Sequence, residues 1–388
     1  MTRPIVLFYV QHLVGVGHLF RARHVVQAMV AAGLEVHLIS GGMPVPGFDV
    51  PGTTIHQLPP VMCRDGDFRT LLQEDGSPVG AQLKKSRCRQ LLTIYDEIRP
   101  SALITEAFPF GRRQMRFELD ALLERARSAV PSPVIICSVR DILQAGSKPE
   151  RVRETVDAVN AVFDHVLVHG DPAFASLEMT FPLADEIAGK VKYTGLVAGP
   201  GEDLPVWTGN EGGEILVSVG GGAEGHELLS AAVGARPITN AKNHHWRVLT
   251  GPNLAVRWQD RFSSGVSDGI TVEPNRPDFP TLLANCALSV SQAGYNTAVN
   301  IIQCACRSVL VPYAAHGQTE QSVRARRMQH LGLAKMVDPE NLSPASLAEA
   351  IDAAMEAPPP RPGGIALNGA QTSARLVARW LDHRTQHD

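Results

Sequence analysis

The stretch from Ile5 to His18, IVLFYVQHLVGVGH, decides the fold because an apolar run passes directly into a glycine-rich turn. Its first six residues are apolar and rich in branched side chains, which is typical of a strand buried on both faces of a parallel sheet. The two glycines predict a tight turn into a helix that begins near His18 and ends at Gly33. A second strand follows at 34–39, so these elements predict the start of a doubly wound α/β sheet.

The same pattern restarts in the second half of the chain. Residues 214–219 are typical of a strand that ends in Gly220-Gly221-Gly222, and a strand at 288–290 leads into the turn Ser291 to Thr297. Between the halves, 195–213 holds six glycines and two prolines, a composition that favours a linker. We therefore expect two Rossmann-like domains, at 1–196 and 214–365, joined by a linker at 197–213.

Length and composition limit the class of protein. The chain has 388 residues, of which 44% are hydrophobic and 19% charged, and its formal net charge is −3. These values are normal for a soluble globular protein, and the near-neutral balance gives no support for nucleic-acid binding. No apolar stretch is long enough to span a bilayer, and polar residues between 11 and 23 interrupt any secretory h-region.

The cysteines give no sign of a disulfide framework or a metal site. They are Cys63, Cys88, Cys137, Cys286, Cys304 and Cys306. No pair has C-x-x-C spacing, so we expect reduced thiols, no bound metal and a cytoplasmic protein. An apolar or basic surface patch could still dock peripherally on the inner face of a membrane without leaving a linear signature.

The first glycine turn offers a candidate general base. Gly15 and Gly17 precede His18 at the start of the expected helix. The helix dipole disfavours an imidazolium there and lowers the pKa of the histidine, so a neutral ring can accept a proton from an acceptor hydroxyl. The alternative is a histidine that caps the helix or packs against the sheet.

A second candidate lies at the end of the short strand 102–104. Glu106 stands beside apolar residues that would raise the pKa of its carboxyl and suit it to acid–base work. The alternative is an ordinary loop carboxylate paired with Arg112 or Arg113. These two arginines and Arg116 have helical spacing, so they either bind an anionic acceptor or form a solvated face.

The turns of the second half are candidate phosphate sites. Gly220-Gly221-Gly222 leaves its backbone open to a diphosphate, although a merely structural turn is equally consistent, and no P-loop lysine follows. In the next turn Gly294 permits close approach, and Asn296 and Thr297 can donate to phosphate at the helix start. Asn296 could instead be the helix N-cap. The loop His316 to Gln321 could hold ribose or sugar hydroxyls, or cap the next helix.

With these segments assembled, the chain resembles a glycosyltransferase of the GT-B fold. Its C-terminal half is similar to the bacterial transferase that adds N-acetylglucosamine to a lipid-linked peptidoglycan precursor, through the stretch Ser289 to Ala334. Nearly the whole chain resembles a group of bacterial predicted glycosyltransferases. The strings that carry this likeness are Tyr9 to His12, Gly15 to His18, Glu106 to Arg113, Ser138 to Asp141 and Val168 to Pro172.

This resemblance implies two facing Rossmann-like domains with a cleft between them. The first domain would bind the acceptor, the second would bind the nucleotide sugar, and a C-terminal helix within 366–388 would pack back on the first domain. It implies an inverting, metal-independent transfer that needs no cofactor besides the donor, a nucleotide-diphosphate sugar and most simply a UDP-sugar such as UDP-GlcNAc. The acceptor would be a small-molecule or lipid-linked hydroxyl or amine.

The sequence patterns and the resemblance together give each candidate residue an expected role. The catalytic candidates are His18 and Glu106. The acceptor-binding candidates are His12, Gly15, Gly17 and Arg112. The donor-binding candidates are Gly220, Gly221, Gly222, Gln292, Gly294, Tyr295, Asn296, Thr297, Asn300, Glu320 and Gln321.

One position departs from the pattern. Relatives usually carry a glutamate that accepts from the ribose hydroxyls, whereas this chain has Asn300, which can bond ribose only without charge assistance. Two rival functions therefore stay open: a nucleotide-sugar epimerase of the same architecture and a non-catalytic nucleotide-sugar-binding protein. A dinucleotide-dependent oxidoreductase fits poorly, because Phe20 stands where a third glycine would be.

Overall fold

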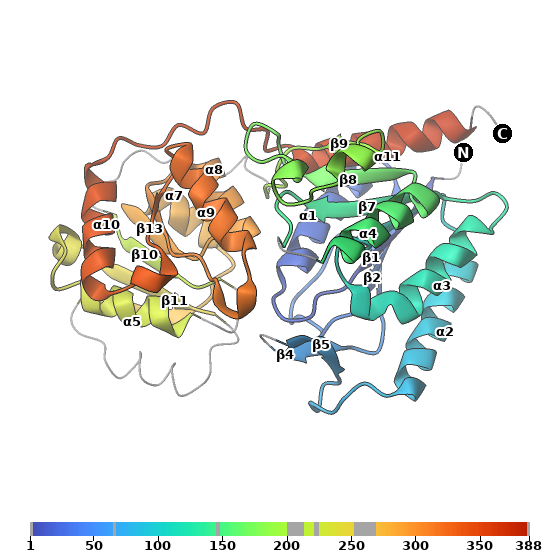
Figure 1. The fold of residues 1–388 in the computed structure, drawn as a ribbon, viewed down its shortest axis with the longest axis horizontal. Helices are drawn as coiled ribbons and strands as arrows, with labels where there is room; N and C mark the ends of the chain where they lie inside the picture. The colour runs from blue at the N-terminus through green and yellow to red at the C-terminus, as the bar shows by residue number, and fades with distance from the viewer. Residues whose placement is uncertain are drawn as a thin grey trace. The chain divides into compact units, whose positions relative to one another are not determined.

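The computed structural model describes residues 3–64, 67–144, 148–199, 213–220, 225–251 and 269–385 (Figure 1). The chain divides into two compact units, one formed by Met1–Val197 with Ala366–Asp388 and the other by Ala198–Ile365. Each unit is built around its own parallel sheet with helices packed on it. The expected class, an α/β protein with two Rossmann-like sheets, is confirmed. Most of the expected linker, residues 200–212, lies outside the described residues.

The first unit contains a seven-stranded parallel sheet in the order β3-β2-β1-β6-β7-β8-β9. Its strands are β1 (Ile5–Val10), β2 (Glu35–Ser40), β3 (Thr53–Gln57), β6 (Ala102–Glu106), β7 (Val134–Arg140), β8 (His165–His169) and β9 (Val191–Tyr193). The chain runs outward from β1 to β3 on one side and from β6 to β9 on the other. The neighbours β1 and β6 therefore form the topological switch point, where ligands of such sheets bind beyond the strand ends.

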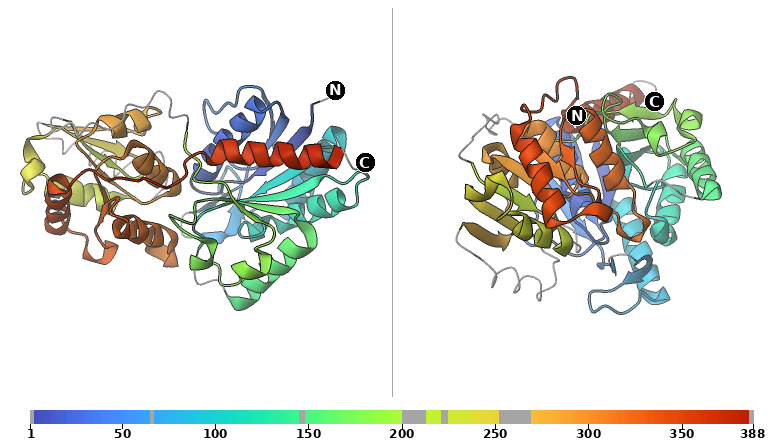
Figure 2. Two further views of the ribbon diagram at one scale, coloured as in Figure 1. Left: turned by 90° about the horizontal axis from the view of Figure 1, so that it is seen from above. Right: turned by 60° about the vertical axis from the view of Figure 1, so that its left-hand side comes forward.

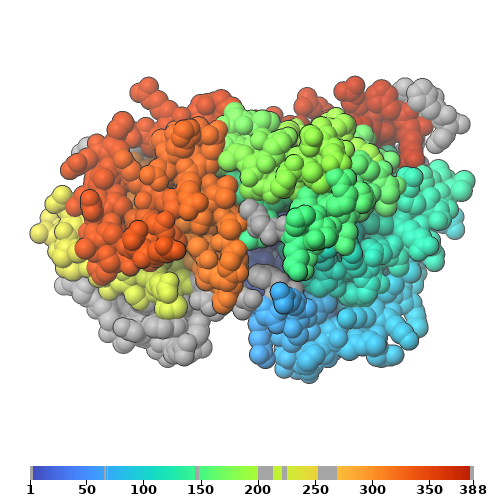
Figure 3. Space-filling view, viewed as in Figure 1, coloured from blue at the N-terminus to red at the C-terminus, as the bar shows by residue number. Residues whose placement is uncertain are grey.

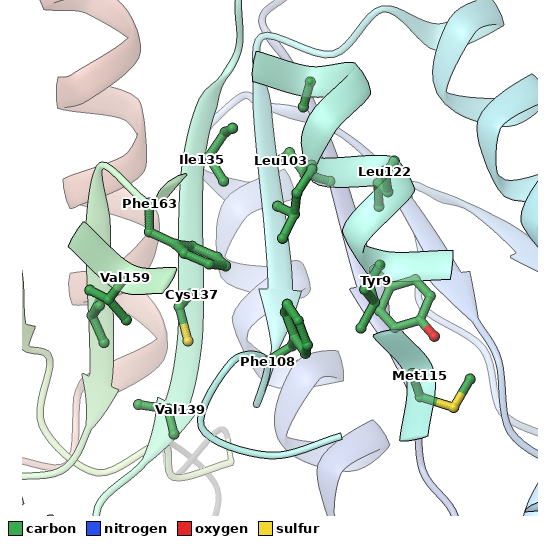
Figure 4. Packing of buried hydrophobic residues seen from close by; sticks show 14 of the residues in the cluster. Tyr9, Leu103, Phe108, Met115, Leu122, Ile135, Cys137, Val139, Val159 and Phe163 are labelled. Carbon is green, nitrogen blue, oxygen red and sulfur yellow. The ribbon is translucent and has the colours of Figure 1, made fainter. Parts of the chain in front are cut away.

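Helices cover both faces of this sheet. They are α1 (Gly17–Ala31), α2 (Ala81–Ile98), α3 (Arg116–Arg127), α4 (Pro149–Val162) and α11 (Gly369–Thr385). Side chains alternate along β1, so Val6 and Phe8 pack in the cluster that includes α1 and α11. Leu7 and Tyr9 pack in the opposite cluster, where Tyr9, Leu103 and Leu122 meet between the sheet and α3 (Figure 4). Burial on both faces explains why the whole of β1 is apolar.

The last helix of the chain, α11, belongs to the first unit and runs alongside α1 (Figure 2). The chain enters it through an antiparallel bridge between Val197 and Asn368. The side chains of Ala370, Ala374, Val377 and Leu381 are all at most 4% exposed. Their spacing places them on one helical face, which buries against the apolar side of the sheet.

The second unit contains a six-stranded parallel sheet in the order β12-β11-β10-β13-β14-β15. Its strands are β10 (Ile215–Ser218), β11 (Trp246–Thr250), β12 (Ile270–Pro274), β13 (Leu288–Ser291), β14 (Ser308–Leu310) and β15 (Lys335–Met336). Its helices are α5 (His226–Ala235), α7 (Phe279–Asn285), α8 (Tyr295–Cys304), α9 (Glu320–His330) and α10 (Pro344–Glu356). The switch point here lies between β10 and β13, so the turn after β13 stands at its edge.

One segment differs from the prediction. Residues 59–80 are rich in proline, glycine and aspartate and show little periodicity, a pattern that predicts a long surface loop, but they contain an antiparallel hairpin of β4 (Met62–Arg64) and β5 (Asp67–Leu72). The hairpin is part of the surface in the space-filling view, in blue (Figure 3). Leu71 and Cys63 are nevertheless buried in the core of the first unit, which anchors the hairpin to the sheet.

Candidate active site

The switch point of the first sheet carries both catalytic candidates. His18 is the second residue of α1, directly after the turn that follows β1, and Glu106 is the last residue of β6. The two side chains meet, with His18 Nδ1 3.0 Å from Glu106 Oε1. The Glu106 side chain is 1% exposed, whereas the His18 side chain is 15% exposed. The carboxylate is therefore internal, and the imidazole keeps a route to a ligand.

Glu106 is held as a carboxylate by its other partners. Arg21, one turn further along α1, donates to Oε1, and the Ser138 hydroxyl at the end of β7 donates to Oε2. Burial by itself would raise the pKa of Glu106, but the Arg21 charge and the hydrogen bond from His18 hold this pKa far below its usual range. The prediction of a raised pKa is wrong, and the partner of the carboxylate is Arg21 rather than Arg112 or Arg113.

The ionised carboxylate fixes the tautomer of His18. Nδ1 also lies 3.1 Å from a guanidinium nitrogen of Arg21, but that nitrogen donates to Glu106, so we assign the ring proton to Nδ1, which donates it to the carboxylate. The other ring nitrogen, Nε2, then holds the lone pair. Burial, followed by the charge of Arg112, holds the pKa of His18 well below its ordinary value, so the ring is neutral near pH 7. A neutral imidazole with Nε2 as acceptor has the form of a general base.

A buried hydrogen-bond chain continues behind Glu106. Ser138 Oγ lies 2.9 Å from His169 Nε2, and His169 Nδ1 lies 3.1 Å from Thr194 Oγ1. Because the single Ser138 proton goes to Glu106, His169 Nε2 donates to Ser138. The Thr194 hydroxyl also donates to the Gly195 carbonyl oxygen over 2.9 Å. Burial and the Arg21 charge lower the pKa of His169 to about 3, so this ring is neutral as well. The protons of Ser138 and of His169 Nε2 both point toward Glu106.

Sequence reasoning missed Arg21, His169 and the role of Ser138. Arg21 stands three residues after His18, a spacing that places both on one helical face, so its presence beside the base could have been read from the sequence. Ser138 is aligned with Glu106 in the pairing of β6 and β7. That register depends on the strand order, which the sequence does not give directly.

Arg112 is joined to the loop after β1. Its Nε donates to the Gln11 carbonyl oxygen over 2.7 Å, and its backbone is left-handed with φ 60°. The Gln11 side chain in turn accepts from Arg87, a fully buried arginine paired with Glu118 at 2.7 Å. Buried polar groups thus fix the loop that leads to Gly15 and Gly17.

The other acceptor candidates separate into internal and exposed groups. His12 is 3% exposed, and its Nε2 lies 2.9 Å from the Met43 carbonyl oxygen, so its ring is part of the packing of the loop. Gly15 and Gly17 are half-buried in the turn. Arg113 and Arg116 pair with the exposed Glu154 at 2.7 and 3.2 Å, as a solvated face requires. Arg112 alone of the three turns toward the loop after β1.

In the second unit, the turn after β13 begins α8 with a glycine at the N-cap. Gly294 has extended φ and ψ of −61° and 155°, and no side chain caps the helix. The alternative that Asn296 is the N-cap is therefore wrong. Tyr295 is buried, whereas Gln292, Asn296, Thr297 and Asn300 are half-buried. Asn296 and Asn300 are separated by four residues and share a helical face, as contact with one ligand would require.

Glu320 and Gln321 are engaged by the protein itself. Gln321 Oε1 accepts from the backbone N–H groups of Ala293 and Tyr313, both at 3.0 Å. Glu320 pairs with Arg324 at 3.2 Å, and Arg324 also donates to the Ala293 carbonyl oxygen. These contacts fix the turn after β13 to the loop after β14. Contact of Glu320 and Gln321 with a sugar or ribose stays a prediction.

The first turn of the second unit is described only at its start. Gly220 has a positive φ of 67°, and its carbonyl oxygen accepts from Asn275 over 3.1 Å. A side chain at this position would be strained, which explains the glycine. Gly221 and Gly222 lie outside the described residues.

A cavity of about 230 Å³ lies in the first unit on the same edge as His18. It is lined by the segments that follow β6, β7 and β8 and by one face of α4. Phe110 and Phe181 meet edge to face there, with ring centroids 5.1 Å apart. Its size suits a single ring or a short branched chain rather than a whole nucleotide.

The described part of the chain holds neither a cluster of metal-ligating side chains nor a membrane-spanning helix. Within residues 3–64, 67–144, 148–199, 213–220, 225–251 and 269–385, no three His, Cys, Asp or Glu side chains group as metal ligands. In the same ranges, every helix is too short or too polar to cross a membrane.

Comparison with known proteins extends the resemblance. Residues 216–364 match the glycosyltransferase family 28 C-terminal domain. An uncharacterised glycosyltransferase of Methanopyrus kandleri is 28% identical over 179 residues, which are 43% of this chain and 45% of that protein. The UDP-N-acetylglucosamine–N-acetylmuramyl-(pentapeptide) pyrophosphoryl-undecaprenol N-acetylglucosamine transferase of Thermotoga neapolitana is 27% identical over 186 residues, 47% of this chain and 50% of that protein. The chain thus spans about half the length of these curated relatives.

The fold comparison covers the whole chain. The crystal structure of CalG4, the calicheamicin glycosyltransferase, aligns with a TM-score of 0.61 at 15% identity, over 100% of this chain and 98% of that one. At this identity the likeness shows the fold. The chain has the two-domain fold of the GT-B glycosyltransferases, and residues 216–364 of its second unit match the glycosyltransferase family 28 C-terminal domain.

Proposed function

We propose that this protein is an inverting glycosyltransferase that moves a sugar from a nucleotide-diphosphate donor to a hydroxyl or amine acceptor. The single observation that carries the proposal is the pair of His18 and Glu106 at the switch point of the first sheet. The family 28 domain and the glycosyltransferase relatives support the reaction class. We infer a UDP-sugar as donor, because the Thermotoga neapolitana relative is named for UDP-N-acetylglucosamine.

In this mechanism His18 acts on the acceptor. The acceptor O–H or N–H donates to Nε2, and its lone pair attacks the anomeric carbon as the proton passes to the ring. The acceptor attacks this carbon on the face opposite the diphosphate oxygen. The bond between the carbon and that oxygen breaks, so the configuration at the carbon inverts. The imidazolium that forms is stabilised by the Glu106 carboxylate 3.0 Å from Nδ1. Glu106 stays ionised throughout, since its other partners are Arg21 and Ser138.

The donor would bind the second unit. The half-buried residues Asn296, Thr297 and Asn300, together with the first-turn N–H groups of α8, are suited to a diphosphate and a ribose. The negative charge of the leaving diphosphate would be stabilised by such donors. We propose no metal and no further cofactor for this step, since backbone donors and the helix N-terminus can carry that role.

The test is release of nucleoside diphosphate from candidate donors by the wild type, His18→Gln and His24→Gln. His24 lies on the same helix and its Nδ1 makes no hydrogen bond, so its variant serves as the matched control. We expect the His18 variant to lose at least 100-fold in kcat with the donor still bound, and the control to keep wild-type turnover. Donor binding with equal turnover in wild type and His18→Gln would refute the base. A changed sugar without an acceptor would indicate an epimerase.

A further inference from the structure

The cavity of the first unit is built by loops that begin at the residues around the candidate base. One wall is Phe110, which stands four residues after Glu106 in the loop that follows β6. Another is Leu143, five residues after Ser138, whose hydroxyl donates to Glu106. The two loops are joined where they start, since the Ala107 N–H donates to the Ser138 carbonyl oxygen over 2.7 Å. Four residues of chain span at most about 14 Å, so the Phe110 backbone lies within that distance of the Glu106 backbone.

Hydrogen bonds fix the walls of this cavity to one another. Thr155 Oγ1 on α4 donates to the Arg151 carbonyl oxygen over 2.9 Å and also lies 3.5 Å from the Pro109 carbonyl oxygen. Thr180 Oγ1 accepts from the backbone N–H of Leu143 over 3.0 Å. These contacts join α4 to the loop after β6, and the loop after β8 to the loop after β7. The cavity therefore has the pre-formed walls that are typical of a small-molecule site.

The contacts that the cavity offers to a ligand are mainly apolar. Its apolar lining consists of Phe110, Leu143, Val152, Met179, Phe181 and Pro182. Among the polar lining residues, Gln144, Arg151 and Glu178 are exposed, and Arg113 pairs with Glu154 at 2.7 Å. The two threonines are held by the hydrogen bonds between the walls. A ligand that enters therefore gains by burying apolar surface.

Two aromatic rings in the lining favour a third ring as the ligand. Phe110 and Phe181 meet edge to face, with centroids 5.1 Å apart and ring planes at 66°. This geometry is attractive because the positive edge of one ring faces the negative face of the other, and a bound aromatic ring can repeat it. A dry apolar cavity of about 150 Å³ binds benzene, so one of about 230 Å³ has room for a single substituted ring.

Met179 is the apolar lining residue that reaches furthest into solvent. Its side chain lines the cavity and is nevertheless 49% exposed, which is unusual for a large apolar residue. A flexible thioether adapts its shape to a ligand and makes favourable contacts with the edges of aromatic rings. Burial of this side chain under a bound ring would remove an exposed apolar group from water.

We propose that this cavity binds an aromatic ring of the acceptor, while the hydroxyl or amine that reacts is carried to His18 on a short connection. This inference rests on the proposed function and names the substrate class of that site: aryl compounds whose nucleophilic group is separated from the ring by a few bonds. Glu106 and Phe110 stand at the two ends of one short loop, so the loop sets the spacing between base and ring.

The first test needs no turnover. The full-length protein, labelled at its methionine methyl groups, is titrated with phenol and with cyclohexanol, two alcohols of the same ring size. The Met179 methyl signal is followed by NMR and identified with Met179→Leu. We expect phenol to shift this signal and to bind roughly three- to tenfold more tightly than cyclohexanol. No shift with phenol, or equal affinities for the two alcohols, would overturn the proposal.

A matched pair of variants locates the bound ring. Val152 is 7% exposed in the lining, so Val152→Phe fills the cavity and should weaken phenol binding at least tenfold. Val130→Phe adds the same ring at a site that is 98% exposed and should leave phenol binding unchanged. Phe181→Leu keeps the lining apolar but removes one ring, so the preference for phenol should disappear; this variant decides the question should Val152→Phe fail to fold. Unchanged phenol binding in Val152→Phe, or a preference that persists in Phe181→Leu, would refute the site.

Two further arms assign the ring to the acceptor and separate this inference from the reaction itself. Phenol should bind equally well with saturating UDP present, whereas displacement by UDP would assign the cavity to the donor and overturn the proposal. In turnover, phenylpropanol should have a kcat/KM at least threefold above that of cyclohexylpropanol, and Val152→Phe should raise the KM of phenylpropanol with the donor KM unchanged. Equal kcat/KM values for the two alcohols would count against an aryl acceptor. Absence of any His18-dependent transfer would refute the proposed function, while the phenol titration still decides the cavity.

Discussion

Replacing Glu106 by glutamine tests the electrostatic part of the proposed mechanism with little change of shape. The amide oxygen can still accept from His18 Nδ1 and Arg21, and the amide nitrogen would face Ser138. Ser138 can respond by donating to His169 Nε2, which shifts the ring proton of His169 to Nδ1, beside Thr194. The hydrogen-bond chain therefore survives with its donors reversed, and the main loss is the negative charge.

The magnitude follows from the geometry. The imidazolium formed during proton transfer has its Nδ1 3.0 Å from the carboxylate oxygen. With charge centres roughly 4 Å apart and an effective dielectric constant of about 20, the attraction is about 4 kcal/mol. The retained amide hydrogen bond recovers part of it, so we expect a loss of about 3 kcal/mol, or roughly 100-fold to 1,000-fold in kcat.

A second effect falls on stability. Arg21 is 2% exposed and would lose its counter-charge, and breaking a buried pair on one side costs about 3–5 kcal/mol of folding free energy. The double variant Glu106→Gln/Arg21→Met removes the stranded cation. It should recover most of the stability while kcat stays low, because the imidazolium still lacks its carboxylate.

The assay measures nucleoside diphosphate release under saturating donor, with denaturant unfolding of each variant in parallel. The reasoning would be refuted by a folded Glu106→Gln protein within fivefold of wild-type kcat. It would equally be refuted by a double variant that regains turnover together with stability, since the loss would then come from a disturbed fold.

Three further predictions follow from the same contacts. kcat/KM should fall only in acid, because His18 must be neutral and its pKa lies below the ordinary value; a rate that needs protonated His18 would contradict this. The folded pKa of His169, about 3, lies below its unfolded value. The neutral ring therefore makes its full contribution to stability above roughly pH 6.5, and this contribution is lost as the pH falls toward 3. In urea unfolding, the free energy of unfolding of His169→Gln should fall less steeply with decreasing pH than that of the wild type. Gln321→Ala should cost about 1–3 kcal/mol and weaken donor binding, whereas Gln321→Glu, which keeps the acceptor oxygen, should recover the stability. An unchanged pH dependence of unfolding in His169→Gln would count against the buried His169 contacts. An unchanged free energy of unfolding in Gln321→Ala would count against the Gln321 contacts.

The strands at the centre of each sheet could be predicted because burial on both faces requires a continuous run of apolar residues. β1 and β10 are runs of apolar residues followed by glycine turns. The edge strands β3 and β9 were missed, since they are short, partly exposed and mixed in composition. The hairpin of β4 and β5 was missed for the same reason.

The candidate site could be predicted in its members but not in its pairing. His18 and Glu106 stand at strand ends, which the sequence reveals, but their contact depends on β6 being the neighbour of β1. The prediction for the Glu106 pKa failed because the local sequence shows only apolar neighbours. Its cation, Arg21, arrives from α1 and reverses the effect of burial.

The charges around His18 act in opposite senses during proton transfer. An acceptor-activating histidine must be neutral before the reaction and cationic during it. Arg21 keeps Glu106 ionised, which fixes the tautomer of His18, but the charges of Arg21, Arg112 and Arg140 also disfavour the imidazolium. Glu106 offsets only part of that cost, since it is already shared with Arg21. The Glu106 carboxylate 3.0 Å from Nδ1 is therefore the group that stabilises the imidazolium during proton uptake, and this is why its replacement by glutamine should lower kcat.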